Sequence, residues 1–479
     1  MSDKQYATSF DIIQISLYAV DDDVKPYANL AGDVCKQFQY FEDIMWPSYA
    51  ATMVIEDSAE SLISTMPIQG FEKVVVEVDD LTGSGGPNEN GRYTYEFRVW
   101  NISNRVEVAR RQQYTLSLLS AEGLRNEGII INKKLSGNTS GVVEKILGEY
   151  LNVDKDKMDI EASTSSITLL PTKKNPFTVI KSFLSKTISE KIAAGTNQEN
   201  TDEVNDDVVS DVSDSEMKTG SGTAGYLFFQ TNRGYVFRSI DSLVSDDSSE
   251  FNGKPVKGNP FYWQPAKFNE DSMNRIQEIA FGQEFDMVKK LREGHYASIG
   301  CFLNINTLTY TEQKYSLVDT WEDMAHLGSQ TKLPMGQTKL SKFPTRIIST
   351  ILDNEVWNPD PKIASAEDGG DGSHPYQDLQ MHYISQGLAR SGLLFNQQLT
   401  ISLTGQLDLC AGDKIEVRVP EQVAEALKQE TTYDPEHSGT YLIKQVNHQF
   451  NTGDSRTVYT VLDLIRDSQG IKDQESIVK

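Results

Sequence analysis

Alternation of apolar and polar residues predicts β-strands near the N-terminus. Ile13, Ile15 and Leu17 alternate with Gln14 and Ser16. Successive side chains of a strand point to opposite faces, so this pattern indicates a half-buried strand over residues 10–19. The same alternation returns in residues 73–78, 92–100 and 111–120. Residues 1–120 are therefore predicted to form a small β-domain.

The C-terminal part of the chain has a second set of alternating runs. Leu399, Ile401 and Leu403 alternate with hydroxyl side chains, and Gly412-Asp413 gives a turn into the next run. Two longer runs follow, joined by a turn rich in Asn, Gly and Asp, at residues 441–450 and 456–465. Four antiparallel strands in so short a stretch predict a small barrel or sandwich.

The middle of the chain mixes helical and strand patterns. Apolar residues recur every three or four positions over residues 142–150, and again over 177–192 after the helix-start pair Asn175-Pro176. Short strands are predicted at 226–230 and 235–238. The last three segments are predicted as mixed helix, strand and helix, at residues 273–292, 297–310 and 376–395. The fold class is α+β, mainly β.

Composition excludes several function classes. The 479 residues suggest roughly three or four domains, and the net charge of −24 is unsuited to gripping nucleic acid phosphates or an anionic membrane surface. Cys35, Cys301 and Cys410 lie far apart, which favours a reducing compartment over a disulfide framework. No run approaches a membrane span, and the N-terminus lacks a secretory signal. The acidic stretch 201–218 is expected to be a mobile loop.

Candidate chemistry is weak throughout. Residues Gly220–Gly225 fit GxGxxG, but an acidic segment precedes them and a predicted strand follows, so a flexible joint is favoured over nucleotide binding. The six histidines show no metal-ligand spacing, and the sequence has no nucleophile elbow. We therefore predict no catalytic, cofactor-binding or metal-binding residues, no cofactor, and no enzymatic activity.

Several segments resemble one protein family in number and order. They include YFEDIMWPSYAATMVIEDSAESLISTMPIQGFEKVVVEV, YTYEFRVWNISNR, NPFTVIKSFLSKTIS, FFQTNRGYVFRSIDSL and LFNQQLTISLTGQLDLCAGDKIEVRVP. Together they resemble the baseplate central hub proteins of contractile-tailed, T-even-type bacteriophages, over most of residues 8–467. These are scaffold patterns and not catalytic signatures.

The resemblance implies a virion structural protein of the tail baseplate, made in the bacterial host cytoplasm. Two tube-type β-barrels per chain would form a pseudo-sixfold ring as a homotrimer. The ring would join the sixfold tail tube, or tube-initiator proteins, to a trimeric spike. DNA would pass through the lumen without specific binding, and no stable membrane insertion is expected.

The resemblance also implies a division of the chain. The expected parts are a first tube-type barrel at 1–120, an intervening α/β domain at 121–200, an acidic linker at 201–222, strands joining the second barrel at 223–245, a second part of the intervening region at 246–392, the second tube-type barrel at 393–467 and a tail at 468–479.

Interfaces are expected at edge strands, because exposed strand edges pair readily. The candidate segments are 92–100, 399–405 and 456–465, and the candidate side chains are Tyr93, Tyr95, Phe97, Leu399, Ile401, Leu403, Val458 and Thr460. Interior strands that only pack the core are the alternative. Two other functions stay open, a hub of a related contractile injection or secretion apparatus and a tail-associated cell-wall hydrolase.

Overall fold

The computed structural model describes most residues of the chain. They are residues 10–20, 22–32, 34–57, 68–80, 92–108, 111–190, 224–245, 260–263, 274–282, 286–305, 308–321, 324–328, 343–352, 375–421, 433–452 and 456–470. The acidic stretch 201–218, most of the GxGxxG segment and the linker 201–222 lie outside them.

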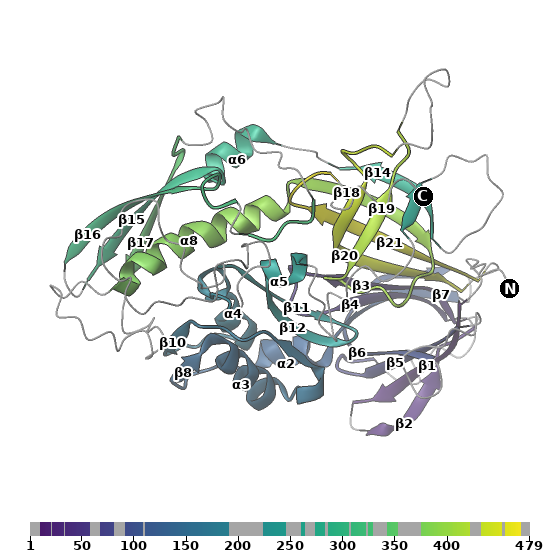
Figure 1. Cartoon of the computed structure of the whole chain (residues 1–479). Helices are drawn as coiled ribbons and strands as arrows, with labels where there is room; N and C mark the ends of the chain where they lie inside the picture. Colours follow the sequence, from purple (N-terminus) through teal and green to yellow (C-terminus); the bar gives the residue numbers. More distant parts are fainter. Residues whose placement is uncertain are drawn as a thin grey trace, which may run out of the picture.

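Seven strands form the N-terminal β-domain (Figure 1). They are β1 (Phe10–Ala19), β2 (Asp22–Asn29), β3 (Cys35–Asp43), β4 (Ala50–Asp57), β5 (Lys73–Asp80), β6 (Arg92–Val108) and β7 (Arg111–Leu119). Their order in the sheet is β3-β4-β7-β6-β5-β1-β2, and the sheet curves around one core that includes Ile15, Phe38 and Phe97. The alternation in the sequence thus predicted these strands because each one buries a single face.

Six strands close into a barrel in the C-terminal half. They are β13 (Phe261–Trp263), β14 (Arg275–Phe281), β18 (Gln397–Thr404), β19 (Lys414–Arg418), β20 (Gly439–Asn451) and β21 (Thr457–Arg466). The ring closes because β19 pairs with both β13 and β20. Its interior is apolar and includes Ile401, Val417 and Leu462. The predicted fold class, α+β and mainly β, is confirmed. The barrel is not wholly antiparallel, because β13 pairs in parallel with both β14 and β19.

Strand β20 joins the two β-domains. Its first residues pair with β19 in the barrel, whereas Gln445–Asn451 pair with β3 of the N-terminal domain. Strand β21 pairs with β20 along nearly its whole length. The far ends of these two strands place Phe450 and Val458 in the N-terminal core. One sheet therefore runs through both β-domains without a break.

An α/β region packs beside the two β-domains (Figure 1). Its elements are α2 (Ala121–Gly128), β8 (Leu135–Asn138), α3 (Thr139–Leu151), η1 (Lys155–Lys157), β9 (Met158–Ile160), β10 (Ser166–Leu169), α4 (Pro176–Lys181), η2 (Leu184–Lys186), β11 (Tyr226–Thr231), β12 (Gly234–Ser239) and α5 (Ile240–Val244). The helix predicted to follow Asn175 ends at Lys181, much earlier than the apolar stripe suggested.

One predicted pairing is wrong. Residues 223–245 were expected to join the second barrel, but β11 and β12 pair with each other and with β9. Strands β13 and β14 take that place in the barrel instead. Both faces of β11 are buried, one in the α/β core and one against the barrel. Alternation and apolar content identify a strand, but they do not identify its partner.

A small outer layer completes the described chain. It contains α6 (Met287–Glu293), β15 (Ala297–Asn304), β16 (Thr309–Ser316), β17 (Arg346–Leu352) and the long helix α8 (Pro375–Leu394). Helix α8 lies against β15 and β16 and then leads directly into β18 of the barrel (Figure 1). The helix predicted at 376–395 is confirmed. The segment 273–292 divides into strand β14 and helix α6.

Candidate interaction surface

The continuous sheet presents one long outer face. Along its run β14-β18-β21-β20-β3-β4-β7-β6, the apolar side chains point into the two cores, so the intervening residues face outward. We call this surface the outer face of the shared sheet. It spans both β-domains because β20 and β3 pair directly.

Neutral polar side chains form a row across the outer face. Directly paired residues on successive strands follow one another from β18 to β6, namely Thr404, Tyr459, Gln449, Gln39, Thr52, Ser117 and Asn101. None of them is charged. The neighbouring row, Ser402, Val461, Asn447, Phe41 and Ala50, is also uncharged. Amides and hydroxyls of this kind hydrogen-bond to water or to a partner without holding a phosphate by charge.

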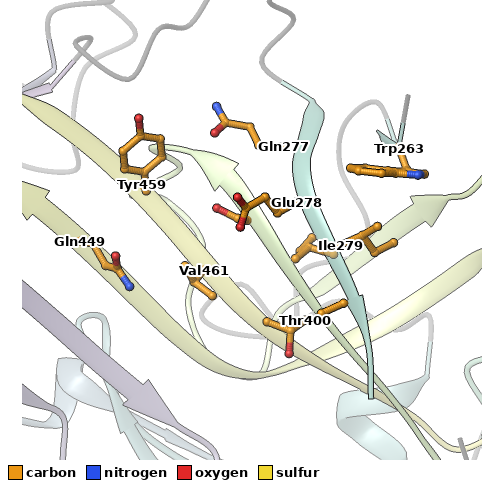
Figure 2. Close-up of a pocket in the computed structure, with 11 residues that line it drawn as sticks. Trp263, Gln277, Glu278, Ile279, Thr400, Gln449, Tyr459 and Val461 are labelled. Atoms are coloured by element: carbon orange, nitrogen blue, oxygen red, sulfur yellow. The ribbon is translucent and has the colours of Figure 1, made fainter. Parts of the chain in front are cut away.

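A hollow of about 780 Å³ lies over one end of the outer face. Figure 2 shows it beside β14, where Gln277 and Glu278 come from the strand edge and Thr400 and Val461 come from β18 and β21. Tyr459 continues the neutral row into this hollow. The lining mixes polar and apolar side chains, and its one charged group is Glu278.

A buried carboxylate seals the inner side where the two β-domains meet. Glu42 accepts hydrogen bonds from the Tyr40 hydroxyl at 2.6 Å and from the backbone N–H groups of Asn232 at 2.6 Å and Ala411 at 2.8 Å. Burial raises the pKa of Glu42 to about 7, although these hydrogen bonds and the nearby Arg233 act in the opposite direction. Three distant parts of the chain thus meet on one side chain.

The same junction holds an ion pair and a neutral histidine. Arg233 donates to both carboxylate oxygens of Asp413, at 2.8 and 2.9 Å. His448 stacks on Tyr40 with 5.9 Å between ring centroids, and burial lowers the pKa of His448 to about 3. Because the ring stays neutral at ordinary pH, it adds no charge to the junction.

A second buried cluster fixes helix α8 to the barrel. Arg390 is fully buried and donates to Asp467 at 2.8 Å, to Asp241 at 3.0 Å and to the backbone carbonyl of Ala325. His326 contacts Asp467 through Nδ1 at 2.9 Å and the Trp321 carbonyl through Nε2 at 2.8 Å. The ring therefore bridges the carboxyl group of Asp467 and the backbone of Trp321.

The charges of this cluster change the pKa of its carboxyl groups. Burial alone would raise the pKa of Asp467, but the hydrogen bond from His326 and the charge of Arg390 hold it well below its ordinary range. Burial keeps the pKa of Asp241 raised in spite of Arg390. These ionisable groups therefore bind one another, as is typical of a cluster that stabilises the fold.

The predicted interface side chains lie elsewhere than expected. All are between 0% and 8% exposed and belong to the chain's own cores, as is seen for Tyr93, Tyr95, Phe97, Leu399, Ile401, Leu403, Val458 and Thr460. Strands β18 and β21 have partners on both sides, so the prediction that 399–405 and 456–465 are edge strands is wrong. Their apolar alternation reports burial within the chain, which was the alternative reading.

The outward residues were the signal that sequence reasoning missed. Gln445, Asn447 and Gln449 alternate with buried residues on β20, and Gln37 and Gln39 do so on β3. The pattern is visible in the sequence, but the contact between these two strands is not.

The described parts of the chain contain neither a cluster of metal-ligand side chains nor a membrane-spanning helix. No described group of three or more His, Cys, Asp or Glu side chains is placed to hold a metal ion. Among the described helices, none is both long and apolar enough to cross a membrane.

Comparisons with known proteins give structural likenesses only. No protein-family model matches the chain, and no curated protein matches it. It is similar to a tail protein from Neisseria meningitidis MC58, with a TM-score of 0.47, 9% identity and coverage of 96% of this chain and 97% of that one. It is also similar to the 43 kDa tail protein of prophage MuSo2 from Shewanella oneidensis, with a TM-score of 0.47, 10% identity and coverage of 95% and 99%.

A third similar structure is a Francisella PdpA-VgrG complex, with a TM-score of 0.44, 6% identity and coverage of 98% of this chain and 59% of that one. The first two are described as tail proteins, and the second of them comes from a prophage. With TM-scores below 0.5 and such low identities, these likenesses carry no argument about function.

Proposed function

We propose that this protein is a structural hub of a contractile-tail baseplate. Copies of the chain, three by the sequence resemblance, would form a ring that joins a sixfold tail tube to a trimeric spike and leaves a central passage for DNA. The observation that carries the proposal is the shared sheet, which runs through both β-domains and has one unbroken outer face. A single sheet of this extent is suited to forming part of a larger wall.

The chemistry of the outer face supports a passage for DNA. Its central rows are uncharged, and the chain as a whole carries a net charge of −24. DNA is held mainly by lysine and arginine contacts to its phosphates. The central rows of Gln, Asn, Thr and Ser offer no such contacts, so DNA would slide along them without being retained.

The buried ionisable groups favour a scaffold over an enzyme. Glu42 and Arg390 each bond to groups from distant segments, and neither is exposed to a substrate. We therefore place the function in assembly. Clearing of peptidoglycan by the purified chain in a zymogram would overturn this assignment in favour of a cell-wall hydrolase.

The deciding measurement is the solution mass by light scattering after size exclusion. One chain has a mass of 53.6 kDa, and a particle of three chains is the expected result. A monomer that becomes a trimer when the spike protein is added would also support a hub. A chain that stays monomeric with the spike present would refute the proposal. The same assay with the spike protein of a secretion apparatus would test whether the chain is instead the hub of such an apparatus.

A further inference from the structure

Strands β14 and β6 are each paired along only part of one side, although β13 lies beyond β14 and β5 lies beyond β6 in the sheet. In the barrel, β14 pairs with β18 through residues 276–281, and β13 reaches only Arg275 and Ile276 on its other side. In the N-terminal domain, the second half of β6 pairs with β7 on one side, whereas the pairing of β6 with β5 on its other side extends only to Arg98. Among the described residues, no strand pairs with the outer side of 277–281 or of 101–108.

We propose that these two edges pair with each other between neighbouring copies of the chain, so that β14 of one copy extends the sheet at β6 of the next. The contact is head to tail, and it continues the shared sheet from copy to copy. This inference rests on the proposed function for the number of copies, but the pairing of the edges is a separate claim.

Strand direction supports this pairing. Every neighbouring pair along β14-β18-β21-β20-β3-β4-β7-β6 is antiparallel. The run contains an even number of strands, so its two edge strands point in opposite directions. When a second copy lies beside the first with its outer face on the same side, β14 of one copy is antiparallel to β6 of the other. Rotation about a common axis keeps the faces aligned, and heterologous contacts form a closed ring when that rotation returns to the first copy.

Backbone groups on β14 point to the open side. Gly282 donates its N–H to the carbonyl of Gln398 on β18 at 3.0 Å. Hydrogen-bonded and non-hydrogen-bonded positions alternate in an antiparallel pair. Ile279 and Phe281 are therefore the positions whose N–H and C=O groups point away from β18. An exposed row of this kind is a template for another strand.

The edge of β14 lacks the usual protection against pairing. Strand β2, at the far end of the N-terminal sheet, carries Lys25 and Pro26, which discourage another strand from pairing. Residues 277–281 read Gln-Glu-Ile-Ala-Phe, without lysine, proline or arginine, and Phe281 is 48% exposed. An edge without lysine or proline that carries an exposed aromatic side chain is suited to a covered position in an assembly.

The edge of β6 offers a matching segment. Its flat part is Asn101–Ser103, which ends where Asn104 takes a φ of 54° and the register shifts. Trp100 is the extra residue of a bulge and is 54% exposed. Exposed Arg105 lies next to this segment and would face the side of the contact that carries Glu278. A tryptophan near the hollow beside β14 is the kind of anchor that dominates protein interfaces.

Cysteine cross-linking tests the contact directly. Ala280→Cys and Ser103→Cys place a thiol on each edge, in a Cys301→Ser background because the other two native cysteines are buried. With a short bismaleimide, the double variant is expected to give a ladder of covalent oligomers on a denaturing gel. Each single variant is expected to stay monomeric, because a head-to-tail contact brings unlike edges together.

A matched pair of variants tests the backbone hydrogen bonds. Phe281→Pro removes an outward N–H, whereas Phe281→Ala removes the same ring and keeps the N–H. Loss of the cross-linked ladder in the proline variant, with the ladder kept in the alanine variant, is the expected result. Equal behaviour of the two variants would overturn the role of β14 backbone pairing.

The outcomes separate this inference from the hub itself. A trimer by light scattering without any ladder would overturn the edge contact and leave the hub proposal standing. A ladder in either single variant would point to a two-fold contact and overturn the head-to-tail arrangement. A monomer without a ladder would overturn the edge contact, and the spike experiment would then decide the hub.

Discussion

Replacing Arg390 by methionine tests the buried ion cluster. The side chain is fully buried, and its loss would leave Asp467, Asp241 and the Ala325 carbonyl without their shared donor. Removing one partner of a buried ion pair costs about 3–5 kcal/mol, because the remaining charge stays desolvated. Methionine fills much of the same space, so most of the cost is expected to be electrostatic.

Hydrogen exchange followed by mass spectrometry measures this cost locally. Peptides covering residues 383–394 and 462–468 report on α8 and on the end of β21. A loss of about 3–5 kcal/mol in opening free energy corresponds to exchange that is roughly a hundredfold to a few thousandfold faster in these peptides. Peptides of the N-terminal β-domain are expected to change much less.

A surface ion pair supplies the control. Arg456 donates to Asp11 at 2.6 Å, and its side chain is 60% exposed. Arg456→Met should cost no more than about 1 kcal/mol, because water screens exposed pairs. If Arg390→Met were as mild as Arg456→Met, the reasoning about the buried cluster would be refuted.

Three further changes are expected to alter stability. The pKa of Glu42 is raised from 4.5 to about 7 in the folded protein, so the unfolded state loses this proton at a lower pH. The free energy of unfolding should therefore fall by about 3 kcal/mol as the pH rises from 4.5 to about 7. Urea titrations at several pH values should show that Glu42→Gln removes this dependence. Gly412→Ala should cost about 1–3 kcal/mol, because φ is 86° and a Cβ would lie 2.7 Å from a phenyl ring of β11. The control Gly32→Ala has a similar φ of 79° but open space around the Cβ, so it should cost about 1 kcal/mol. Thermal melting measures both. Phe450→Ala should cost about 3–5 kcal/mol in urea unfolding by emptying the place where β20 enters the N-terminal core, and Phe343→Ala, at an exposed site, should cost under about 0.5 kcal/mol. An equal loss in each variant and its control would contradict the last two.

Strand existence was predictable because most strands bury one face. Ile13, Ile15 and Leu17 do not follow this rule perfectly, since Ile13 is 38% exposed near a register shift of β1, but the strand forms as predicted. The helix after Asn175 shows the opposite error. Its apolar stripe continues past Lys181 because the following residues pack as a 3₁₀ turn and short bridges in the same core.

Pairing between distant strands was not predictable in the same way. Nothing in residues 275–281 distinguishes a barrel strand from the helical segment expected there, because its exposed edge leaves little alternation. Residues 226–239 read correctly as strands but were assigned to the wrong sheet. The predicted interface side chains are mostly apolar because they fill the cores of the chain, and for this reason they are buried and not exposed at an interface.

The sequence alone determined which segments are strands, that two β-rich regions lie at the two ends of the chain, and that its charge is unsuited to holding nucleic acid. Tertiary structure decided that β20 belongs to both regions, that neutral rows cross the middle of their common outer face, and which strand edges are left open. The physical reason is that alternation records only whether a side chain meets water or a core. The identity of a strand's neighbour depends on contacts between residues hundreds of positions apart, such as the pairing of Gln449 with Gln39.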